Sequence, residues 1–420
     1  MNILVVGSGG REHAICAAID RSSRVEKIYC ANGNAGISQI AECVPIRPEE
    51  IEELAEFASS NSIDLTFVGG ETPLALGVVD EFEKRGLNIV GPTKAAAELE
   101  ASKAFSKDFM ARHGVPTAAY RTANSTAEAI AMLDDGVFGD ERSSVVVKAS
   151  GLAAGKGVVV AANRREAGEA IQDLASIAGE SAAERIVLEE CLIGREVSLI
   201  MFADGEDFAL MPPTRDHKRI GEGDTGPNTG GMGTITDASL LTHDQTRQVI
   251  DEIITPTLLG CISEGFPFRG ILFLGLMMTA GGPKLLEYNV RFGDPETQSI
   301  LVRLETDLVD ICEAMLEGRL SEIDIRWKPG SSATVVLAAG GYPYNPRKGD
   351  VISGLDRIEG ATVFHAGTAK NASGEFVTAG GRVLGITATG GDLDSALSKA
   401  YVEVAKISFN GMQYRRDIGR

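Results

Sequence analysis

The chain has 420 residues, 44% of them hydrophobic and 24% charged, which is the composition of a folded globular protein with roughly two to four packed units. Its 40 Lys and Arg residues against 59 Asp and Glu residues give a net charge of −19, which disfavours nucleic-acid binding because that needs a basic surface. The chain start lacks a signal-peptide pattern, no apolar run approaches the about 20 residues of a membrane span, and the six cysteines form no C-x-x-C pair, so we expect a cytoplasmic protein with buried free thiols.

The first hundred or so residues predict a doubly wound, Rossmann-like domain. Ile3–Val6 is a short apolar run followed by the glycine-rich stretch Gly7–Gly10 and then by a helical stretch, which is how a parallel βαβ unit begins. The loop reads G-x-G-G rather than G-x-G-x-x-G, and no clear acid ends the second strand, so NAD binding is the weakest interpretation. The further expected strands are 28–31, 65–68 and 87–90, and the expected helices are 11–20, 48–60 and 73–85.

The rest of the chain predicts a two-part central domain and a small terminal α+β domain. A helical stretch at 94–113, ended by Gly114 and Pro116, links the first domain to the second. We predict domains at 1–102, 103–325 and 326–420, and we divide the middle one into a lid part at about 120–190 and a larger part at about 191–325. The expected strands are 145–148, 157–161, 185–189, 196–203, 270–279, 284–288, 334–339, 361–365 and 376–386, and the expected helices are 164–178, 243–264, 298–317 and 393–407.

A glycine-rich loop follows the expected strand at 145–148. Backbone N–H groups exposed by glycine, together with lysine ammonium groups, enclose phosphates in many proteins. The loop is not a Walker A motif, because the G-x-x-x-x-G-K-[ST] spacing is missing, and a plain hairpin tip remains the alternative. The residues that would meet a triphosphate are Lys148, Gly151, Gly155, Lys156 and Gly157.

A possible metal site stands near the end of the expected strand at 284–288. Glu287 and Asn289 are two residues apart, and side chains two apart on a strand point to the same face. A carboxylate and an amide oxygen side by side suit Mg²⁺. The turn that follows carries Arg291, Asp294 and Glu296, and charges packed beside a metal site indicate substrate handling.

The segment 214–233 is too polar and too rich in glycine to be a core element. It has four titratable residues in a row, from Asp216 through His217 and Lys218 to Arg219, followed by several glycines. Loops of this length in compact domains are usually functional or disordered, so we expect a lid over the reacting groups. We expect His217 to make contacts or to orient a group rather than to transfer protons.

Seven motifs together carry a family resemblance. They are G-S-G-G-R-E-H at 7–13, N-G-N-A-G at 32–36, G-L-A-A-G-K-G at 151–157, D-H-K-R at 216–219, D-T-G-P-N-T-G-G-M-G at 224–233, R-F-G-D-P-E-T-Q at 291–298 and A-A-G-G-Y-P at 338–343. In this order and across essentially the whole chain, they resemble the phosphoribosylamine–glycine ligase family of the ATP-grasp superfamily. The resemblance implies a multidomain α/β and α+β fold with an N-terminal Rossmann-like substrate-binding domain, a two-part ATP-grasp domain and a small C-terminal α+β domain.

The resemblance also implies roles for individual residues. Glu287 and Asn289 are implied as ligands of Mg²⁺ or Mn²⁺, and the number of ions stays open because no acid stands near 275–277, where many ATP-grasp enzymes carry a further ligand. The implied catalytic residues are Lys218, Arg291 and Asp294. The implied ATP-binding residues are Lys103, Lys148, Gly151, Gly155, Lys156, Gly157, Glu189, by the adenine, and Glu196, by the ribose. The implied residues for the other substrates are Gly9, Gly10, Arg11, Glu71, Asp216, Arg291, Asp294 and Arg382.

The implied function is ATP-dependent ligation of glycine to 5-phospho-β-D-ribosylamine through a glycyl phosphate, in de novo purine biosynthesis. Closure of the loops at 151–157 and 214–233 is expected to exclude water from that intermediate. We expect only small-molecule partners, with no nucleic acid and no membrane, and a monomer or small homo-oligomer.

Three alternatives to this function stay open. One is another ATP-grasp carboxylate–amine ligase, or a glycinamide ribonucleotide transformylase that uses formate. A second is a noncatalytic nucleotide-binding regulator, which is disfavoured because Lys148, Glu287 and Asn289 are all present. The dehydrogenase suggested by the first glycine loop is the third.

Overall fold

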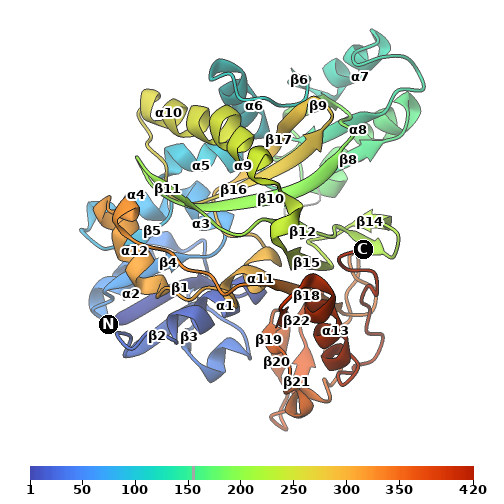
Figure 1. Ribbon diagram of the computed structural model, residues 1–420. Helices are drawn as coiled ribbons and strands as arrows, with labels where there is room; N and C mark the ends of the chain where they lie inside the picture. The colour runs from blue at the N-terminus through green and yellow to red at the C-terminus, as the bar shows by residue number, and fades with distance from the viewer. Residues whose placement is uncertain (154–156) are drawn as a thin grey trace.

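The computed structural model describes residues 1–153 and 157–420 (Figure 1). Its N-terminal domain is a parallel sheet with the order β3-β2-β1-β4-β5. The strand β1 contains the continuous apolar run Ile3–Val6, which is fully buried because helices cover both faces of such a sheet. The strands are β1 Asn2–Gly7, β2 Lys27–Asn32, β3 Glu42–Val44, β4 Leu65–Val68 and β5 Ile89–Val90, and the helices are α1 Gly10–Ile19, α2 Ile51–Ser60, α3 Glu71–Leu76 and α4 Val78–Lys84.

The helical stretch that links the first two domains is divided into α5, Lys94–Ala101, and α6, Lys103–Arg112. A single helix was predicted here, but Ser102 has an extended backbone and its hydroxyl accepts a hydrogen bond from the backbone N–H of Phe105, so it caps α6. The break brings the start of α6 to the glycine-rich loop, where the Lys103 N–H donates to the Ser150 carbonyl at 2.8 Å.

A small antiparallel sheet with the order β6-β9-β7-β8 forms the lid part of the middle domain. The helices α7 and α8 pack on it, and their apolar residues share one buried cluster with the strands. Asn163 caps α8 by accepting from the backbone N–H of Glu166. The elements are β6 Tyr120–Ala123, α7 Thr126–Asp134, β7 Val145–Ala149, β8 Val158–Ala161, α8 Arg164–Ala178 and β9 Ile186–Glu190.

A larger antiparallel sheet runs from the middle domain into the C-terminal region without interruption. Its order is β17-β16-β10-β12-β15-β18-β22-β19, with β11 also paired to β10. The pairing of β15 with β18 joins the two regions, so the predicted terminal domain shares its sheet with the middle domain. The strands are β10 Arg195–Asp204, β11 Phe208–Leu210, β12 Thr214–Asp216, β15 Gly233–Thr236, β16 Arg269–Thr279, β17 Gly282–Asn289, β18 Ser331–Ala338, β19 Thr362–His365 and β22 Arg382–Gly390.

Helices cover this sheet, and two of the predicted ones are divided. The stretch expected at 243–264 contains a π-helical turn at 250–254. In the stretch expected at 298–317, the first helix ends at Leu301 and the second starts at Leu308, capped by the carboxylate of Asp307. The helices are α9 His243–Val249, α10 Thr255–Ser263, α11 Glu296–Leu301, α12 Leu308–Glu317 and α13 Leu393–Val404, and two further short strands are β20 Thr368–Lys370 and β21 Phe376–Thr378.

The prediction that the segment 214–233 contains no core element is wrong. The strand β12 and the start of β15 lie inside this segment and pair with each other in the large sheet, while β13, Arg219–Gly221, and β14, Thr225–Asn228, form a hairpin between them. Polar residues are accommodated because their hydroxyls find partners: Thr234 donates to the Arg215 carbonyl at 3.1 Å.

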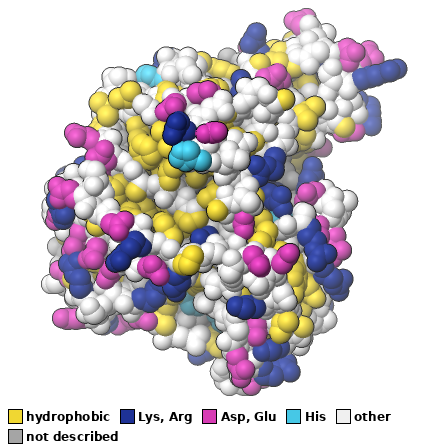
Figure 2. Space-filling model, in the orientation of Figure 1, with side chains coloured by type: hydrophobic (Ala, Val, Ile, Leu, Met, Phe, Trp, Pro, Cys, Tyr) yellow, Lys and Arg dark blue, Asp and Glu magenta, His cyan; other side chains and the backbone are white. Residues whose placement is uncertain are grey.

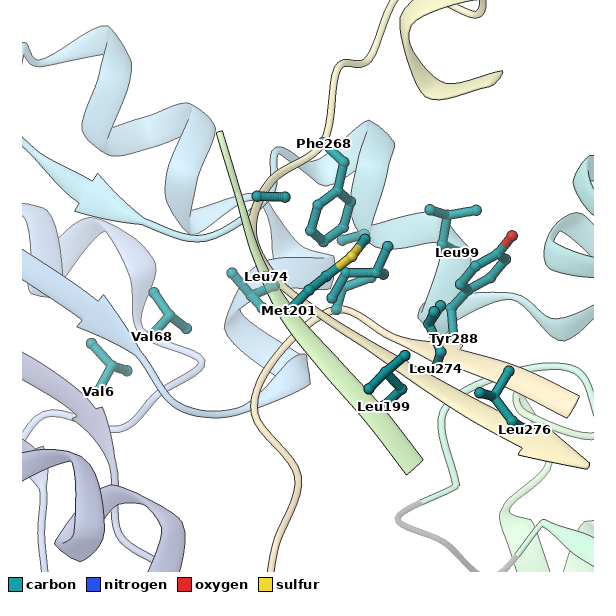
Figure 3. Packing of buried hydrophobic residues seen from close by; sticks show 14 of the residues in the cluster. Val6, Val68, Leu74, Leu99, Leu199, Met201, Phe268, Leu274, Leu276 and Tyr288 are labelled. Carbon is teal, nitrogen blue, oxygen red and sulfur yellow. The ribbon is translucent and has the colours of Figure 1, made fainter. Parts of the chain in front are cut away.

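Buried side chains join the N-terminal domain to the large sheet (Figure 3). Val6 of β1 and Val68 of β4 belong to the same apolar cluster as Leu199 of β10 and Leu274 of β16, with Leu99 of α5 also in it. Each such side chain contributes about 1.5–3 kcal/mol on full burial. The N-terminal domain and the large sheet are therefore held together by one shared hydrophobic core.

The exterior carries charges of both signs. On the face drawn in Figure 2, acidic and basic side chains are interspersed. Among the described residues, no helix combines the length and the apolar character needed to cross a bilayer.

Candidate active site

A cleft of about 690 Å³ lies between the lid part, the start of α6 and the end of β17. It is lined by three lysines, one arginine and four carboxylate residues, together with apolar and amide side chains. The charged and amide residues of the lining are Lys103, Lys107, Lys148, Glu71, Glu100, Glu189, Glu287, Asn289 and Arg291. Four cationic side chains are thus gathered beside four carboxylates in one cleft of a net-negative protein, and the lysines are suited to contact a triphosphate.

Lys148, on β7, belongs to a cluster of buried charged side chains. Its ammonium lies 2.8 Å from the carboxylate of Glu189 on β9, and it also donates to the Leu286 carbonyl at 3.3 Å. A second ammonium, that of Lys107, lies 3.1 Å from the same carboxylate and donates to the hydroxyl of Thr117 at 2.6 Å. Burial lowers the pKa of Lys107 to about 8. The carboxylate of Glu189 is therefore turned toward the two lysines.

The glycine-rich loop packs closely where the structure describes it. Lys103 donates to the Gly151 carbonyl at 3.2 Å. A Cβ on Gly151 would lie 2.8 Å from the Cα of Ala182, and a Cβ on Gly157 would lie 2.7 Å from the Cβ of Ala153, so both positions need glycine for space. Gly155 and Lys156, also predicted to meet phosphates, lie outside the described residues.

Glu287 and Asn289 are brought together on β17 and both line the cleft. Burial by itself raises the pKa of Glu287, but the charges of Lys218, Lys148 and Lys103 outweigh it and hold the pKa below its ordinary value. Within residues 1–153 and 157–420, no group of three or more His, Cys, Asp or Glu side chains is placed to hold a metal ion. An ionised carboxylate beside one amide oxygen fits a Mg²⁺ ion whose other ligands are phosphate oxygens and water.

Arg291 stands at the inner end of the cleft and pairs with two carboxylates. Its Nε lies 3.0 Å from Glu71 and its Nη2 lies 2.7 Å from Glu100, while Nη2 also donates to Asn289 Oδ1 at 3.2 Å. Burial raises the pKa of Glu100 to about 7, and the arginine charge only partly opposes this. For Glu71 the charges of Arg291 and Arg11 prevail over burial and lower the pKa to about 2.

A second cleft, of about 610 Å³, lies at the carboxyl ends of β1 and β4. Gly9, Arg11, Glu71 and Asp294, for which a substrate-binding role was predicted from the sequence, all line this cleft. Ligands bind at this edge in doubly wound sheets. Arg11 donates to the Phe292 carbonyl at 3.0 Å, which ties the first glycine loop to the charged turn after β17.

Glu12 also lines the second cleft and contacts the glycines around it. Its carboxylate accepts from the Gly9 N–H at 2.6 Å and lies 2.6 Å from Arg11 Nε. A Cβ on Gly69 would lie 2.2 Å from Glu12 Oε1, so the loop after β4 needs glycine to pass this side chain. Gly10, predicted to touch substrate, instead faces Gln298, whose Nε2 would lie 2.6 Å from a Cβ at that position.

Asp294 links the charged turn to the C-terminal region. Its carboxylate lies 3.1 Å from Arg382 Nη2 and accepts from Gln298 Nε2 at 2.8 Å. Burial raises the pKa of Asp294, but the charges of Arg382 and Arg11 outweigh it and keep the pKa below its ordinary value. Because Arg382 also donates to the Gly230 carbonyl, it bridges the charged turn and the 214–233 segment.

A cluster of alternating charges lies beside Glu287. Lys218 is 3.3 Å from the carboxylate of Glu196, and the negative charge of Asp216 raises the pKa of Lys218 well above its ordinary value. Burial raises the pKa of Asp216. Burial, followed by the charge of Asp216, raises the pKa of Glu296 to about 7. Glu196 is thus held toward Lys218 in this structure.

Three polar residues of the site were not predicted from the sequence to be site residues: Glu12, Glu100 and Lys107. The sequence spacing could have predicted Lys107, because it lies four residues after Lys103 and therefore on the same face of α6. Glu100 had no such signal, since its partner Arg291 is far away in the sequence and close only in the fold.

Comparison with known proteins decides the family. Models of the Phosphoribosylglycinamide synthetase N domain, ATP-grasp (A) domain and C domain match residues 1–100, 101–297 and 332–420. The chain belongs to the phosphoribosylglycinamide synthetase family. The domain boundaries at residues 102 and 325 stay a prediction.

Relatives of the phosphoribosylglycinamide synthetase family match along the full chain. The phosphoribosylamine–glycine ligases of Vibrio vulnificus (strain YJ016) and Pseudomonas aeruginosa are each 49% identical over 425 aligned residues, which cover 100% of this chain and 98% and 97% of those proteins. The crystal structure of the phosphoribosylamine–glycine ligase of Thermotoga maritima superposes with a TM-score of 0.85 at 34% identity and covers 100% of both chains.

A more distant structure shares only the fold. The biotin carboxylase domain of the Hydrogenobacter thermophilus 2-oxoglutarate carboxylase has a TM-score of 0.74 at 16% identity, covering 98% of this chain and 91% of that one. The predicted family, fold class and enzyme class, an ATP-grasp carbon–nitrogen ligase, are confirmed.

Proposed function

We propose that this chain joins glycine to 5-phospho-β-D-ribosylamine, giving N1-(5-phospho-β-D-ribosyl)glycinamide, ADP and phosphate in de novo purine biosynthesis. Membership of the phosphoribosylglycinamide synthetase family and full-length relatives named as phosphoribosylamine–glycine ligases support this activity. The proposal concerns which residues of the two clefts carry it.

The observation that carries the residue assignment is that Glu71 lines both clefts. A ligase of this kind must activate glycine with ATP at one place and deliver the amine of the sugar phosphate to the same carbon. The first cleft has the lysines and the metal-type oxygens that suit ATP, and the second lies at the ligand-binding edge of the N-terminal sheet. Glu71 and its partner Arg291 mark where the contents of the two clefts meet.

ATP is assigned to the first cleft. Lys103 and Lys148 would meet the phosphates together with the backbone at Gly151 and Gly157, and we retain Gly155 and Lys156 in this role. Because the carboxylate of Glu189 faces Lys148, its contribution to adenine binding would come from the backbone that follows it, with Glu196 at the ribose. Glu287 and Asn289 would hold Mg²⁺ or Mn²⁺, which supplies charge neutralisation on phosphate oxygens.

The reaction proceeds in two transfers. The glycine carboxylate oxygen attacks the γ-phosphorus of ATP, the bond to the β-phosphate oxygen breaks, and ADP leaves. The amine of phosphoribosylamine then attacks the carbonyl carbon of glycyl phosphate, loses a proton and expels phosphate. Lys148 and Lys218 would stabilise negative charge during the first transfer, and Arg291 would hold the glycine carboxylate through its fork.

The sugar phosphate is assigned to the second cleft. Arg11 would meet its phosphate or ribose from the first glycine loop, and Gly9 leaves room beside Asp294. Glu71 and Asp294 would hold the ribose hydroxyls or the amine, since both are carboxylates with pKa values below the ordinary range. Gly10 would contribute by allowing close packing against Gln298, and Arg382 by holding the carboxylate of Asp294. Asp216 would contribute through its negative charge beside Lys218.

The direct test is ADP release in the presence of ATP, Mg²⁺, glycine and freshly generated phosphoribosylamine, with each component omitted in turn. Turnover that requires both glycine and the amine supports the proposal. Turnover with formate in place of glycine would instead favour the transformylase alternative. The Glu287→Gln variant should raise the Mg²⁺ concentration needed for half-maximal rate, while a spectroscopic nucleotide-binding assay without metal should change little.

We also propose a cytoplasmic enzyme that is a monomer or small homo-oligomer. All six cysteines are free, which fits a reducing compartment. Light scattering of the purified chain at several concentrations measures the assembly state.

A further inference from the structure

The last residues of the chain clamp the hairpin of β13 and β14. Figure 1 shows the C-terminus beside β14. The side chain of Arg415 is only 2% exposed, and its Nη1 lies 2.6 Å from Asp224 at the hairpin tip and donates to the Arg219 carbonyl at 3.2 Å. Its Nε and Nη2 each donate to an oxygen of Asp417 at 2.8 Å. One buried guanidinium thus joins the tail to the first residue of β13 and to the turn between β13 and β14.

Two further hydrogen bonds connect the tail to the same segment. The Gly223 N–H donates to the Asp417 carboxylate at 2.8 Å, and the Gly419 N–H donates to Nε2 of His217 at 3.0 Å. Since Nε2 of His217 is the acceptor, its Nδ1 carries the proton and faces the Gly233 carbonyl at 3.3 Å. The imidazole therefore links the tail to the first residue of β15.

The tail is itself anchored on α13. The hydroxyl of Tyr401 donates to the Arg415 carbonyl at 2.8 Å and accepts from the Ile418 N–H at 3.1 Å. Residues 415–418 are thereby held at both ends by one helical side chain. The clamp is part of the folded C-terminal region.

Lys218 lies between two residues that the tail contacts. His217 precedes it and Arg219 follows it, and both accept a hydrogen bond from the tail. On the hairpin side, the Lys218 carbonyl accepts from the N–H and the hydroxyl of Thr229 at 2.7 and 2.8 Å. The backbone of Lys218 is therefore fixed, and its ammonium is directed toward Glu196 at 3.3 Å and close to Asp216 and Glu287.

We propose that Arg415 is a positioning residue of the active site, acting through Lys218. Ion pairs of a buried guanidinium with carboxylates that remain partly exposed are weak support for stability as such, because desolvation and solvent screening offset much of the attraction. Its consequence here is geometric: Arg415 fixes the hairpin relative to α13 and so sets where the Lys218 ammonium stands. The proposal rests on the role of Lys218 in the proposed function.

The test uses full-length variants. Arg415→Met removes the guanidinium but keeps much of the side-chain volume. Arg416→Ala is the matched control, because Arg416 is the neighbouring residue with a side chain 74% exposed and 3.9 Å from Glu222. Asp417→Asn is a milder second variant, which keeps the shape, weakens the hold on Arg415 and remains informative if Arg415→Met folds poorly.

A double-mutant cycle distinguishes positioning from general destabilisation. Arg415→Met should lower kcat by about ten- to a hundredfold, as expected when a catalytic group is displaced, with the KM of phosphoribosylamine changed much less. In a Lys218→Met background the same change should add less than about twofold, because the group through which it acts is gone. Independent, multiplying effects, or an Arg415→Met variant as active as Arg416→Ala, would overturn the proposal.

Hydrogen exchange separates this inference from the proposed function. Peptides covering 217–232 should exchange faster in Arg415→Met and Asp417→Asn than in Arg416→Ala, whether or not the protein ligates glycine. Unchanged exchange would refute the clamp while leaving the ligase assignment intact. Loss of glycine-dependent turnover in the wild type, or full activity of Lys218→Met, would refute the assignment on which positioning rests even if exchange increases.

Discussion

The carboxylate of Glu100 lies 2.7 Å from Nη2 of Arg291 and also accepts the Val290 N–H at 2.7 Å. A helix of the interdomain link thus holds the arginine and the end of β17 together. Since Glu71 contacts Arg291 from the N-terminal domain, the orientation of one guanidinium depends on two domains.

Glu100→Gln is expected to impair glycine use. The amide keeps a hydrogen-bond acceptor for Val290 but no longer holds Arg291 by charge, so kcat/KM for glycine should fall by about ten- to a hundredfold while the affinity for ATP stays nearly unchanged. Steady-state kinetics with each substrate varied measures this. Glu98→Gln, on the same helix, is the matched control, and equal effects of the two variants would count against the role of Arg291.

Lys148 and Lys107 share Glu189 but should respond differently to substitution. Lys148→Met should lower kcat/KM for ATP by about a hundred- to a thousandfold because a charge on the transferred phosphoryl group loses its partner. Lys107→Met should mainly destabilise the fold, by about 1–2 kcal/mol, because it removes one of the two buried ammonium partners of Glu189 and a hydrogen bond to Thr117 while Lys148 still pairs with the carboxylate. Urea unfolding and ATP kinetics on both variants compare the two effects, and the reverse ranking would contradict the assignment of Lys148.

Gly9→Ala should act on the second cleft alone. A Cβ there would lie 2.9 Å from Glu12 Oε2 and 3.2 Å from Asp294 Oδ2, so the carboxylates must shift. Overpacking of this degree costs about 1–2 kcal/mol, which corresponds to roughly a tenfold higher KM for phosphoribosylamine. Gly168→Ala in α8, where the nearest atom would be 3.8 Å away, is the control and should leave kinetics unchanged. An effect on ATP rather than on the amine would place Gly9 elsewhere in the mechanism.

Local sequence patterns were sufficient to predict the fold class of each region of the chain. Apolar runs such as Ile3–Val6 and the alternation of strands with glycine turns located the sheets, and the spacing of Glu287 and Asn289 placed two oxygens on one face of β17. The strand β12 within 214–233 was missed because its Thr214 is buried with its hydroxyl bonded to the Ser198 carbonyl, which composition alone does not reveal. Glu100 and Arg415 were missed for another reason: their partners are distant in sequence, and only the tertiary fold joins them.

Acid should destabilise the contact between the N-terminal domain and the C-terminal region through His13. The ring Nδ1 of buried His13 accepts from the His365 N–H at 2.8 Å, and burial, followed by the neighbouring His365, lowers the pKa of His13 to about 4 from an ordinary 6.5. Between these values the unfolded chain binds the proton and the folded chain does not, so stability is full above about pH 6.5 and falls by about 1.4 kcal/mol per pH unit below it.

His13→Asn tests this pH dependence, since an amide oxygen can accept the same hydrogen bond without titrating. The variant should lose less stability than the wild type between pH 6.5 and 4 in urea unfolding. His243→Asn, at an exposed position, should retain the wild-type slope. A slope unchanged by His13→Asn would mean that this imidazole is not buried neutral.

The most direct measurement of the central claim follows the oxygen of glycine. With glycine labelled by oxygen-18 in its carboxylate, transfer of the γ-phosphoryl group to that carboxylate and attack by the amine leave one labelled oxygen in the released phosphate for each glycinamide ribonucleotide formed. We expect this label in phosphate only when ATP and phosphoribosylamine are both present. Product that forms with unlabelled phosphate would contradict carboxylate activation at the junction of the two clefts.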